Sequence, residues 1–536
     1  MKRWLATSLL AISVISIQTN AFADGLTSGW YTIPEAGSRT GVVGQIFSED
    51  LGGNWDQASR VINNSPARVC SSALDADCSM AHMILAPCEV DAAAACIESV
   101  QLTSANKFSV GKFDRLIGSE SITGYVDHQI PNGYSQSIWK VPGFSTSAGN
   151  DELAVFAKLF FATENTVYKN DETKGFHDLA VSVSPFKVVN DPTLKAPQFV
   201  ADPSTNGIYG NNSYHDCVWV QKGQCGSQVS FPKDTSVTLK LKINKTLNGW
   251  FNARLEQPSI SIEPIDANFN RLTVSGAPAT IQKAYAKLYV DDLPSEIDNF
   301  LKYKEPHGQI INTLTANDPD ALQVWNLWSK YFPVNAQSMR TVWAFNASSQ
   351  SSHPCFRNKK QVLGVITTNA MVYSSLPPKF ENDELIYNVG GIHNDSEGSP
   401  FQGSYNMIID ASTALCLYGF KSVPVKATVS VASSDGTNQL ISTTSLREKD
   451  GWLYLSVSGF TFSSPSIRVK LLPPEEKAPP IQNPVAIPTP AVTNTPAVPL
   501  IPATRNITKT ISCRKGTSIK KVTAVNPICP KGYVKK

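Results

Sequence analysis

The chain has 536 residues, of which 42% are hydrophobic and 17% are charged. The hydrophobic share is enough for folded cores and excludes wholesale disorder. At about 150 residues per domain, the length predicts three or four folded units. The formal net charge of +3 gives no reason to expect a nucleic-acid partner. The ten cysteines, an even number, indicate paired thiols.

The first 23 residues have the pattern of a secretory signal peptide. Lys2 and Arg3 form a basic start, an apolar stretch follows over 5–17, and an A-x-A cleavage motif occupies 21–23. This order predicts export and cleavage before Asp24. Since no later segment has about 20 consecutive apolar residues, we expect no transmembrane segment in the mature chain.

The cysteine spacings favour disulfides, which are the default in an oxidising compartment. Three pairs are eight residues apart, one pair is confined to the C-terminal region and one closes a long loop. The four N-terminal cysteines allow three pairings, and we expect the local one. Because no C-x₂₋₄-C pair occurs, the sequence predicts no zinc site. The expected bridges are Cys70–Cys78, Cys88–Cys96, Cys217–Cys225, Cys355–Cys416 and Cys513–Cys529.

Apolar and polar residues alternate in several stretches of the chain. Residues 237–243, 259–262 and 271–274 each follow this period of two, which is typical of strands with one solvent-facing side. The main part of the chain is therefore predicted to be β-structure.

Two Asp-Gly pairs mark further turns near the end of this region. Asp435-Gly436 follows the alternating residues 427–431 and predicts a hairpin to a further strand. Asp450-Gly451 is expected to open a pair formed by 452–457 and 467–471. The short strands and their spacing favour a meander within a β-sandwich.

Two helices are expected between the β segments. One covers Pro294–Tyr303, and the other begins with Asp318 as N-cap and Pro319 in the first turn. Trp325 and Trp328 recur at helical spacing in the second helix. They could form a sugar-stacking platform, but the periodicity favours an apolar face packed on a sheet.

The chain contains no local catalytic motif, and the sequence predicts no catalytic, cofactor-binding or metal-binding residue. His393–Gly398 offers oxygen ligands for Ca²⁺, but it lacks the spacing of a calcium loop and is better interpreted as a polar turn. Asp75 and Asp77 are interpreted as part of a solvated turn. Tyr214-His215-Asp216 places His beside Asp, but neighbouring residues of a strand point to opposite faces. Paired carboxylates of a glycosidase leave no local signature, so a hydrolase stays an alternative.

The C-terminal region separates into a linker and a basic module. Ten prolines lie between Pro473 and Pro502, a density that excludes helices and sheet ladders. Arg505–Lys536 contains nine basic and no acidic residues, a charge of +9. Residues 24–504 carry 36 basic and 44 acidic residues, a charge of −8. The small total is thus the sum of two opposed parts.

The predicted fold is mainly β, with two or more immunoglobulin-like β-sandwich domains, a short helical connector and a small disulfide-clipped C-terminal β module. The expected parts are a signal peptide (1–23), an N-terminal β domain with Cys70, Cys78, Cys88 and Cys96 (24–200), a β domain with Cys217 and Cys225 (201–292), the connector (293–335), a β-sandwich domain with Cys355 and Cys416 (336–472), a Pro-rich linker (473–504) and the basic module (505–536).

The basic module carries a motif that resembles a known arrangement. The run ISCRKGTSIKKVTAVNPICPKGY at 511–533 resembles a small two-cysteine module found behind Pro-rich linkers in exported actinobacterial proteins. GVITTNA at 364–370, CLYGF at 416–420 and GFTFS at 459–463 are similar to an uncharacterised secreted family with that module. The resemblance implies an extracellular or envelope location and no particular activity. The chain lacks the L-P-x-T-G box of a sortase signal.

These patterns favour a secreted or cell-surface-associated, non-enzymatic β protein that needs no cofactor and serves adhesion, glycan binding or an envelope scaffold. Its basic module would contact anionic envelope polymers and retain the protein at the cell wall, although the same charge also fits a solubilising tail. The alternative is a secreted polysaccharide-acting hydrolase with paired carboxylates. The candidate envelope contacts are Arg514, Lys515, Lys520, Lys521, Lys531, Lys535 and Lys536.

Overall fold

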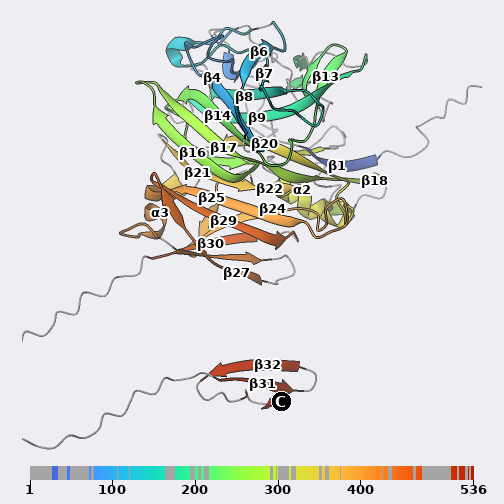
Figure 1. Ribbon diagram of the computed structural model, residues 1–536, viewed down its shortest axis with the longest axis vertical. Coiled ribbons are helices and arrows are strands. Elements are labelled where there is room, and N and C mark those ends of the chain that lie inside the picture. Colours follow the sequence, from blue (N-terminus) through green and yellow to red (C-terminus); the bar gives the residue numbers. More distant parts are fainter. Residues whose placement is uncertain are drawn as a thin grey trace, which may run out of the picture. The chain divides into compact units, whose positions relative to one another are not determined.

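The structure is a computed structural model, and it divides into two compact units, Met1–Glu475 and Glu476–Lys536 (Figure 1). The structure describes residues 27–33, 45–48, 72–73, 78–105, 107–119, 121–162, 175–192, 199–202, 207–210, 217–289, 294–296, 299, 313–315, 321–348, 353–356, 361–374, 376–424, 426–432, 438–462, 466–473, 509–515, 518–524, 529 and 533–535.

Most strands of the first unit belong to one continuous network of nineteen paired strands, so the expectation of a mainly β protein is confirmed. Pairing is largely antiparallel and follows the chain order locally. The strands are β2 (Gln45–Ser48), β3 (Cys78–Ile84), β4 (Cys96–Ser104), β5 (Lys107–Val110), β6 (Lys112–Leu116), β7 (Ser137–Lys140), β8 (Glu152–Ala162), β9 (Gly175–Asn190), β12 (Cys217–Gln221), β13 (Gln224–Gln228), β14 (Thr235–Asn244), β15 (Gly249–Ala253), β16 (Leu255–Pro264), β17 (Phe269–Lys283), β20 (Ser338–Ser348), β21 (Val362–Thr368), β25 (Gln402–Asp410), β28 (Arg447–Lys449) and β29 (Trp452–Thr461).

Smaller sheets and short helices complete the two units. The described residues of the second unit include a three-stranded sheet in the order β32-β31-β33. The remaining elements are β1 (Thr27–Ile33), β10 (Phe199–Asp202), β11 (Gly207–Gly210), β18 (Tyr285–Tyr289), β19 (Thr313–Thr315), β22 (Val372–Tyr373), β23 (Lys379–Glu381), β24 (Glu384–Gly390), β26 (Lys426–Ala432), β27 (Asn438–Ser445), β30 (Ser466–Leu472), β31 (Lys509–Lys515), β32 (Ser518–Ala524), β33 (Val534–Lys535), α2 (Ala321–Trp328), α3 (Ala411–Tyr418) and the 3₁₀ turns η2 (Val126–His128), η4 (Ser329–Tyr331) and η5 (Pro354–Phe356).

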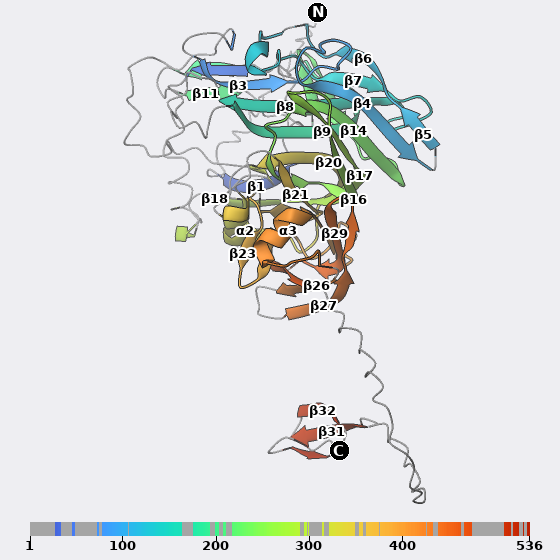
Figure 2. The ribbon, with the colours of Figure 1, turned by 90° about the vertical axis from the view of Figure 1, so that its left-hand side faces the viewer.

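The first unit has two large hydrophobic cores separated by a wall of three strands, β15, β21 and β25. On β15, Trp250 packs in one core and the next residue, Phe251, packs in the other. On β25, Met407 and Ile408 divide between the cores in the same way. Every residue of β15 and β21 is buried. Figures 1 and 2 show β4, β8 and β14 on one side of this wall and β24, β26 and β30 on the other.

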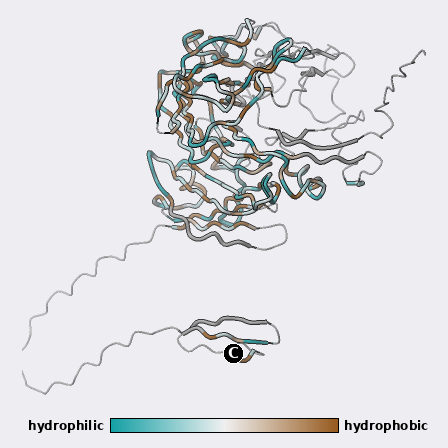
Figure 3. The backbone as a smooth tube through the Cα atoms, turned by 45° about the vertical axis from the view of Figure 1, so that its right-hand side comes forward, coloured by the Kyte–Doolittle hydropathy of each residue, from teal (hydrophilic) through white to brown (hydrophobic). Residues whose placement is uncertain are grey.

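Strands that line only one core show the alternation expected from the sequence. The odd-numbered residues of β14 from Thr235 to Ile243 are buried, and the even-numbered residues between them are only partly buried. The described tube in Figure 3 shows hydrophobic and hydrophilic residues interspersed along such strands. The alternating stretches at 259–262, 271–274 and 427–431 also lie within strands, namely β16, β17 and β26.

The expected meander at the end of the unit is wrong. β29 pairs with β25 and β28, whereas β30 pairs with β24 and β26 in a different sheet. Asp450 and Gly451 both have positive φ, 52° and 79°, as required in a two-residue hairpin turn. The turn therefore joins β29 to the strand before it, and not to the strand after it. The hairpin of β26 and β27 is confirmed, although Asp435-Gly436 lies outside the described residues.

Four of the five expected disulfides are present: Cys88–Cys96, Cys217–Cys225, Cys355–Cys416 and Cys513–Cys529. Cys70 lies outside the described residues, so its bond to Cys78 stays a prediction, as does the signal peptide. The domain boundaries inside the first unit also stay predictions. Strands from both sides of them pair directly, for example β9 with β20.

The second expected helix is present as α2, and Trp325 packs as the periodicity indicated, whereas the side chain of Trp328 lies outside the described part of the structure. Trp325 is only 3% exposed and lies against Phe332, with 5.2 Å between the ring centroids. A Cβ atom on Gly390 would lie 2.6 Å from the indole nitrogen of Trp325, so the helix sits directly on β24. Asp318, Pro319 and most of Pro294–Tyr303 lie outside the described residues. Among the helices the structure describes, none is long and apolar enough to cross a bilayer.

The close packing of the wall predicts that Gly364→Ala destabilises the protein. A Cβ atom there would meet the Trp250 ring and lie 2.7 Å from the carbonyl oxygen of Ile408. Overpacking of this kind costs about 1–3 kcal/mol, which urea unfolding would measure. Gly118→Ala is the matched control, because its Cβ would have no neighbour closer than 3.7 Å. Equal unfolding midpoints for the two variants would contradict the wall packing.

Candidate functional site

The basic module is the candidate site that the sequence singled out, and its three strands give it a defined surface. β31 lies in the middle and pairs antiparallel with β32 and β33. The register places positions 520 and 535 on either side of Cys513. Cys513 is fully buried and bonded to Cys529. A disulfide suits so small a unit, since a few dozen residues seldom bury enough apolar surface to fold alone.

Three of the seven candidate envelope contacts have described side chains, and all three are exposed: Arg514, Lys515 and Lys535. Lys520 and Lys521 are placed on β32 by the strand register alone. Lys531 and Lys536 lie outside the described residues. Because Arg505–Lys536 contains no acidic side chain, no side-chain carboxylate within the module can neutralise its lysines and arginines. The arrangement can attract polyanions, and salt will screen that attraction.

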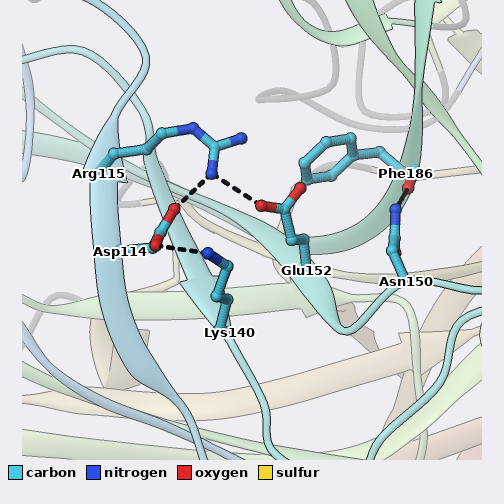
Figure 4. A network of polar contacts seen from close by, with 6 residues as sticks. All are labelled: Asp114, Arg115, Lys140, Asn150, Glu152 and Phe186. Atoms are coloured by element: carbon cyan, nitrogen blue, oxygen red, sulfur yellow. Dashed lines mark hydrogen bonds and ion pairs between the residues drawn. The ribbon is translucent and has the colours of Figure 1, made fainter.

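The first unit contains an ion-pair network on β6, β7 and β8 (Figure 4). Arg115 bridges Asp114 and Glu152, with 2.7 Å between its Nη1 and the Glu152 Oε1, and Lys140 Nζ donates to Asp114 Oδ1 at 2.8 Å. The hydrogen bonds from Lys140 and then Arg115 lower the pKa of Asp114. Those with Glu152 and Asp114 raise the pKa of Arg115. Since each carboxylate faces a cation, the network links three neighbouring strands by their side chains.

A second polar cluster lies where β16 meets β21 and β25. The Ser404 hydroxyl donates to Glu256 Oε1 at 2.5 Å, and the Ser404 amide donates to Asn369 Oδ1 at 2.8 Å. Asn406 Nδ2 donates to Thr367 Oγ1 at 2.8 Å. Burial raises the pKa of Glu256, and hydrogen bonds from Ser404 and Asn406 only partly oppose that shift. The cluster contains Thr367 and Asn369 of the GVITTNA run, and its contacts to Glu256 come from neutral groups.

A buried arginine fixes the backbone beside this cluster. Arg254 is fully buried and donates to the carbonyl oxygens of Thr368, Ala370 and Met371. Its guanidinium carbon lies 4.5 Å from the centroid of the Tyr373 ring. These hydrogen bonds satisfy backbone carbonyl groups at and just after the end of β21, where pairing with the neighbouring strands stops. The role of Arg254 is therefore structural.

The calcium interpretation of His393–Gly398 gains no support. Asp395 Oδ1 accepts hydrogen bonds from the backbone amides of Glu397 and Ser399, both at 2.9 Å, which makes the segment a polar turn. Within the described ranges, no group of three or more His, Cys, Asp or Glu side chains could hold a metal ion. Tyr214-His215-Asp216, Asp75 and Asp77 lie outside those ranges.

Comparisons with known proteins add no assignment to this geometry. No protein-family model matches the chain, and no curated protein is similar to it at a significant level. The resemblance to a secreted actinobacterial family therefore stays a prediction that depends on the quoted motifs.

The ion-pair network predicts a loss of stability at low pH. The pKa of Asp114 is lowered from 3.8 in the folded state, so its stabilisation is complete above that value and is lost as the pH falls below it. Asp114→Asn should lower the melting temperature at pH 7, and the difference from the unmodified protein should shrink below about pH 4. The control is Glu381→Gln, which breaks the more exposed pair with Lys379. A difference that stays constant with pH would contradict this role.

Glu256 should have the opposite pH dependence. Its folded-state pKa is raised above 4.5, so its contribution is complete below that pH and is lost as the pH rises through the raised value. Glu256→Gln keeps an acceptor for Ser404 but cannot ionise, and should therefore be more stable than the unmodified protein at pH 7. Denaturant unfolding between pH 4 and 8 measures this, with Glu263→Gln at the exposed end of the same strand as control. Parallel pH profiles for Glu256→Gln and the unmodified protein would refute the raised pKa.

Proposed function

We propose that this protein is a secreted or cell-surface-associated β protein without enzymatic activity, whose first unit serves adhesion, glycan binding or an envelope scaffold. The second unit would hold the protein on anionic envelope polymers such as phosphate-bearing wall glycans. The observation that carries this proposal is the basic module, a disulfide-bonded sheet with exposed Arg514, Lys515 and Lys535 and no acidic side chain. The four disulfides are compatible with an extracellular location.

The packing of the first unit supports a binding or scaffold role. β25 and β29 share one core with β24, β26 and β30 of another sheet, and we propose that this part is an immunoglobulin-like sandwich. Sheets stacked in this way leave their loops and rims for recognition. The alternative, a polysaccharide hydrolase with paired carboxylates, stays a prediction from the sequence. A panel of glycan substrates would separate the two, because turnover that a single Asp or Glu substitution abolishes would refute the binding proposal.

Retention on cell walls should depend on the charge of the module. We expect the triple variant Arg514→Gln, Lys515→Gln, Lys535→Gln to elute from isolated walls at lower salt than the unmodified protein. Charge attraction is screened over a Debye length of about 10 Å at 0.1 M salt, so the unmodified protein should also be released by a salt gradient. Elution profiles of the full-length chains measure both effects.

The matched control removes three exposed lysines from the first unit: Lys107→Gln, Lys233→Gln and Lys421→Gln. It changes the total charge by the same amount and should leave retention unchanged. Equal weakening by both triple variants would assign retention to net charge. Retention that resists salt, or that the triple variant in the module leaves intact, would remove the module from the proposal.

A further inference from the structure

A pocket of about 230 Å³ opens at the end of the wall where β21 begins and β25 ends. This volume is below the roughly 300–1,000 Å³ of pockets for drug-sized ligands, and it suits a single small ring. Residues from β14, β16 and β17 line one side, and the turn between β28 and β29 lines the other. The sequence assigned none of these residues to a binding site, because they come from segments spread over more than two hundred positions.

The floor of the pocket is apolar. Ile243, Leu247 and Val362 are buried members of the larger hydrophobic core, and Ile262 and Trp452 pack against them while remaining partly exposed. Trp452 therefore both lines the pocket and packs against the larger hydrophobic core. A half-buried aromatic ring is suited to the C–H face of a sugar, because packing already restricts its rotamers and binding then costs little further side-chain entropy.

The rim carries amide and carboxylate groups. Asp410 Oδ1 accepts from the Thr413 amide at 2.9 Å and from Gln361 Nε2 at 3.4 Å, and the Asp410 contacts with Ser412 fall on the same oxygen. No hydrogen bond between described residues uses Asp410 Oδ2. Among the described residues, the Asn270 side chain makes no protein hydrogen bond.

Backbone contacts hold this rim in place. Asp410 lies opposite Trp452 in the pairing of β25 with β29. The Ala411 amide donates to the carbonyl oxygen of Gly451 at 2.9 Å, which ties the start of α3 to the hairpin turn. The Gly249 amide donates to the Gln361 carbonyl oxygen at 3.2 Å. The ring and the rim groups are therefore placed by the sheet itself, which lowers the entropic cost of binding.

We propose that this pocket binds one neutral pyranose ring of a glycan, with the sugar stacked on Trp452 and its hydroxyls bonded to Asn270, Asp410 and Asp450. The inference rests on the proposed glycan-binding role and names the site and the ligand class. Two carboxylates and no Lys or Arg line the pocket, so hydroxyl groups find acceptors while acidic sugars are repelled.

The same carboxylates argue for binding over hydrolysis. Asp410 caps the N-terminus of α3, where its side chain accepts from Thr413. Asp450 is 82% exposed, with its nearest cation, Lys449, 3.9 Å away. A glycosidase needs two carboxylates free to act on either side of the scissile bond, whereas Asp410 is engaged in capping α3 and Asp450 lies on an exposed turn.

The test is calorimetric titration of the full-length protein with neutral gluco-, manno-, galacto- and N-acetylglucosamine oligosaccharides. At least one should bind, and Trp452→Ala should weaken that binding about tenfold or more, which corresponds to ~1.4 kcal/mol. Asn270→Ala should weaken it several-fold. Phe108→Ala, at a ring that is 63% exposed on β5, is the control and should bind as the unmodified protein does. Oligosaccharides of uronic acids should bind more weakly than neutral ones.

Several outcomes would overturn the proposal. They are no binding of any neutral oligosaccharide at millimolar concentration, unchanged binding by both pocket variants, stronger binding of uronic acids, and release of reducing ends. Asn270→Ala keeps the test decisive if Trp452→Ala fails to fold. Failure here is distinguishable from failure of wall retention, because retention is measured with variants of the basic module and binding with variants of the pocket.

Discussion

The first unit depends on a wall of strands that is buried on both faces. β15, β21 and β25 send neighbouring side chains into two different cores, so each strand stabilises both halves of the unit at once. These strands have no solvent-facing side, so their side chains pack closely against neighbouring strands on both faces. Gly364 shows how tight this is, since even one added carbon would collide with Trp250 of the neighbouring strand. A change in the wall therefore affects two cores, whereas a change in β14 or β30 affects one.

Burial on both faces also decides where polar chemistry can occur. Backbone groups inside the wall are satisfied by pairing, so polar side chains gather at its two ends. At one end, where β21 finishes and β25 starts, Arg254 donates to backbone carbonyls and Glu256 is partly buried beside Ser404. At the other, where β21 starts and β25 finishes, Asp410 and Trp452 line the pocket. At the first end, burial raises the pKa of Glu256. The second end contains the proposed sugar pocket.

Much of the fold could be predicted from local patterns, and the exceptions have physical causes. Alternation predicted β14 because that strand contacts a single core, and local cysteine spacing predicted three bridges because each links neighbouring backbone segments. The wall could not be predicted in the same way, because a strand buried on both faces reads as a continuous apolar run such as VLGVI. The meander failed because Asp450-Gly451 specifies a turn but not which neighbouring strand continues the sheet. The basic residues of the tail could be predicted as a site because a cluster of charge can be read from composition. Asn270, Asp410 and Trp452 are far apart in the sequence and come together only through the pairing of strands, so they could not be predicted.

The two proposed binding surfaces differ in their physics. Residues 24–504 carry a charge of −8 and the basic module one of +9. The ten prolines at the end of the first of these segments cannot donate to a sheet ladder. Attraction between the module and a polyanion is long-ranged and weakens as salt is added. Stacking on Trp452 and hydrogen bonding to hydroxyls are short-ranged and insensitive to salt. A change in ionic strength would therefore alter how firmly the chain is held without altering what its pocket selects, so retention and recognition can vary independently in one protein.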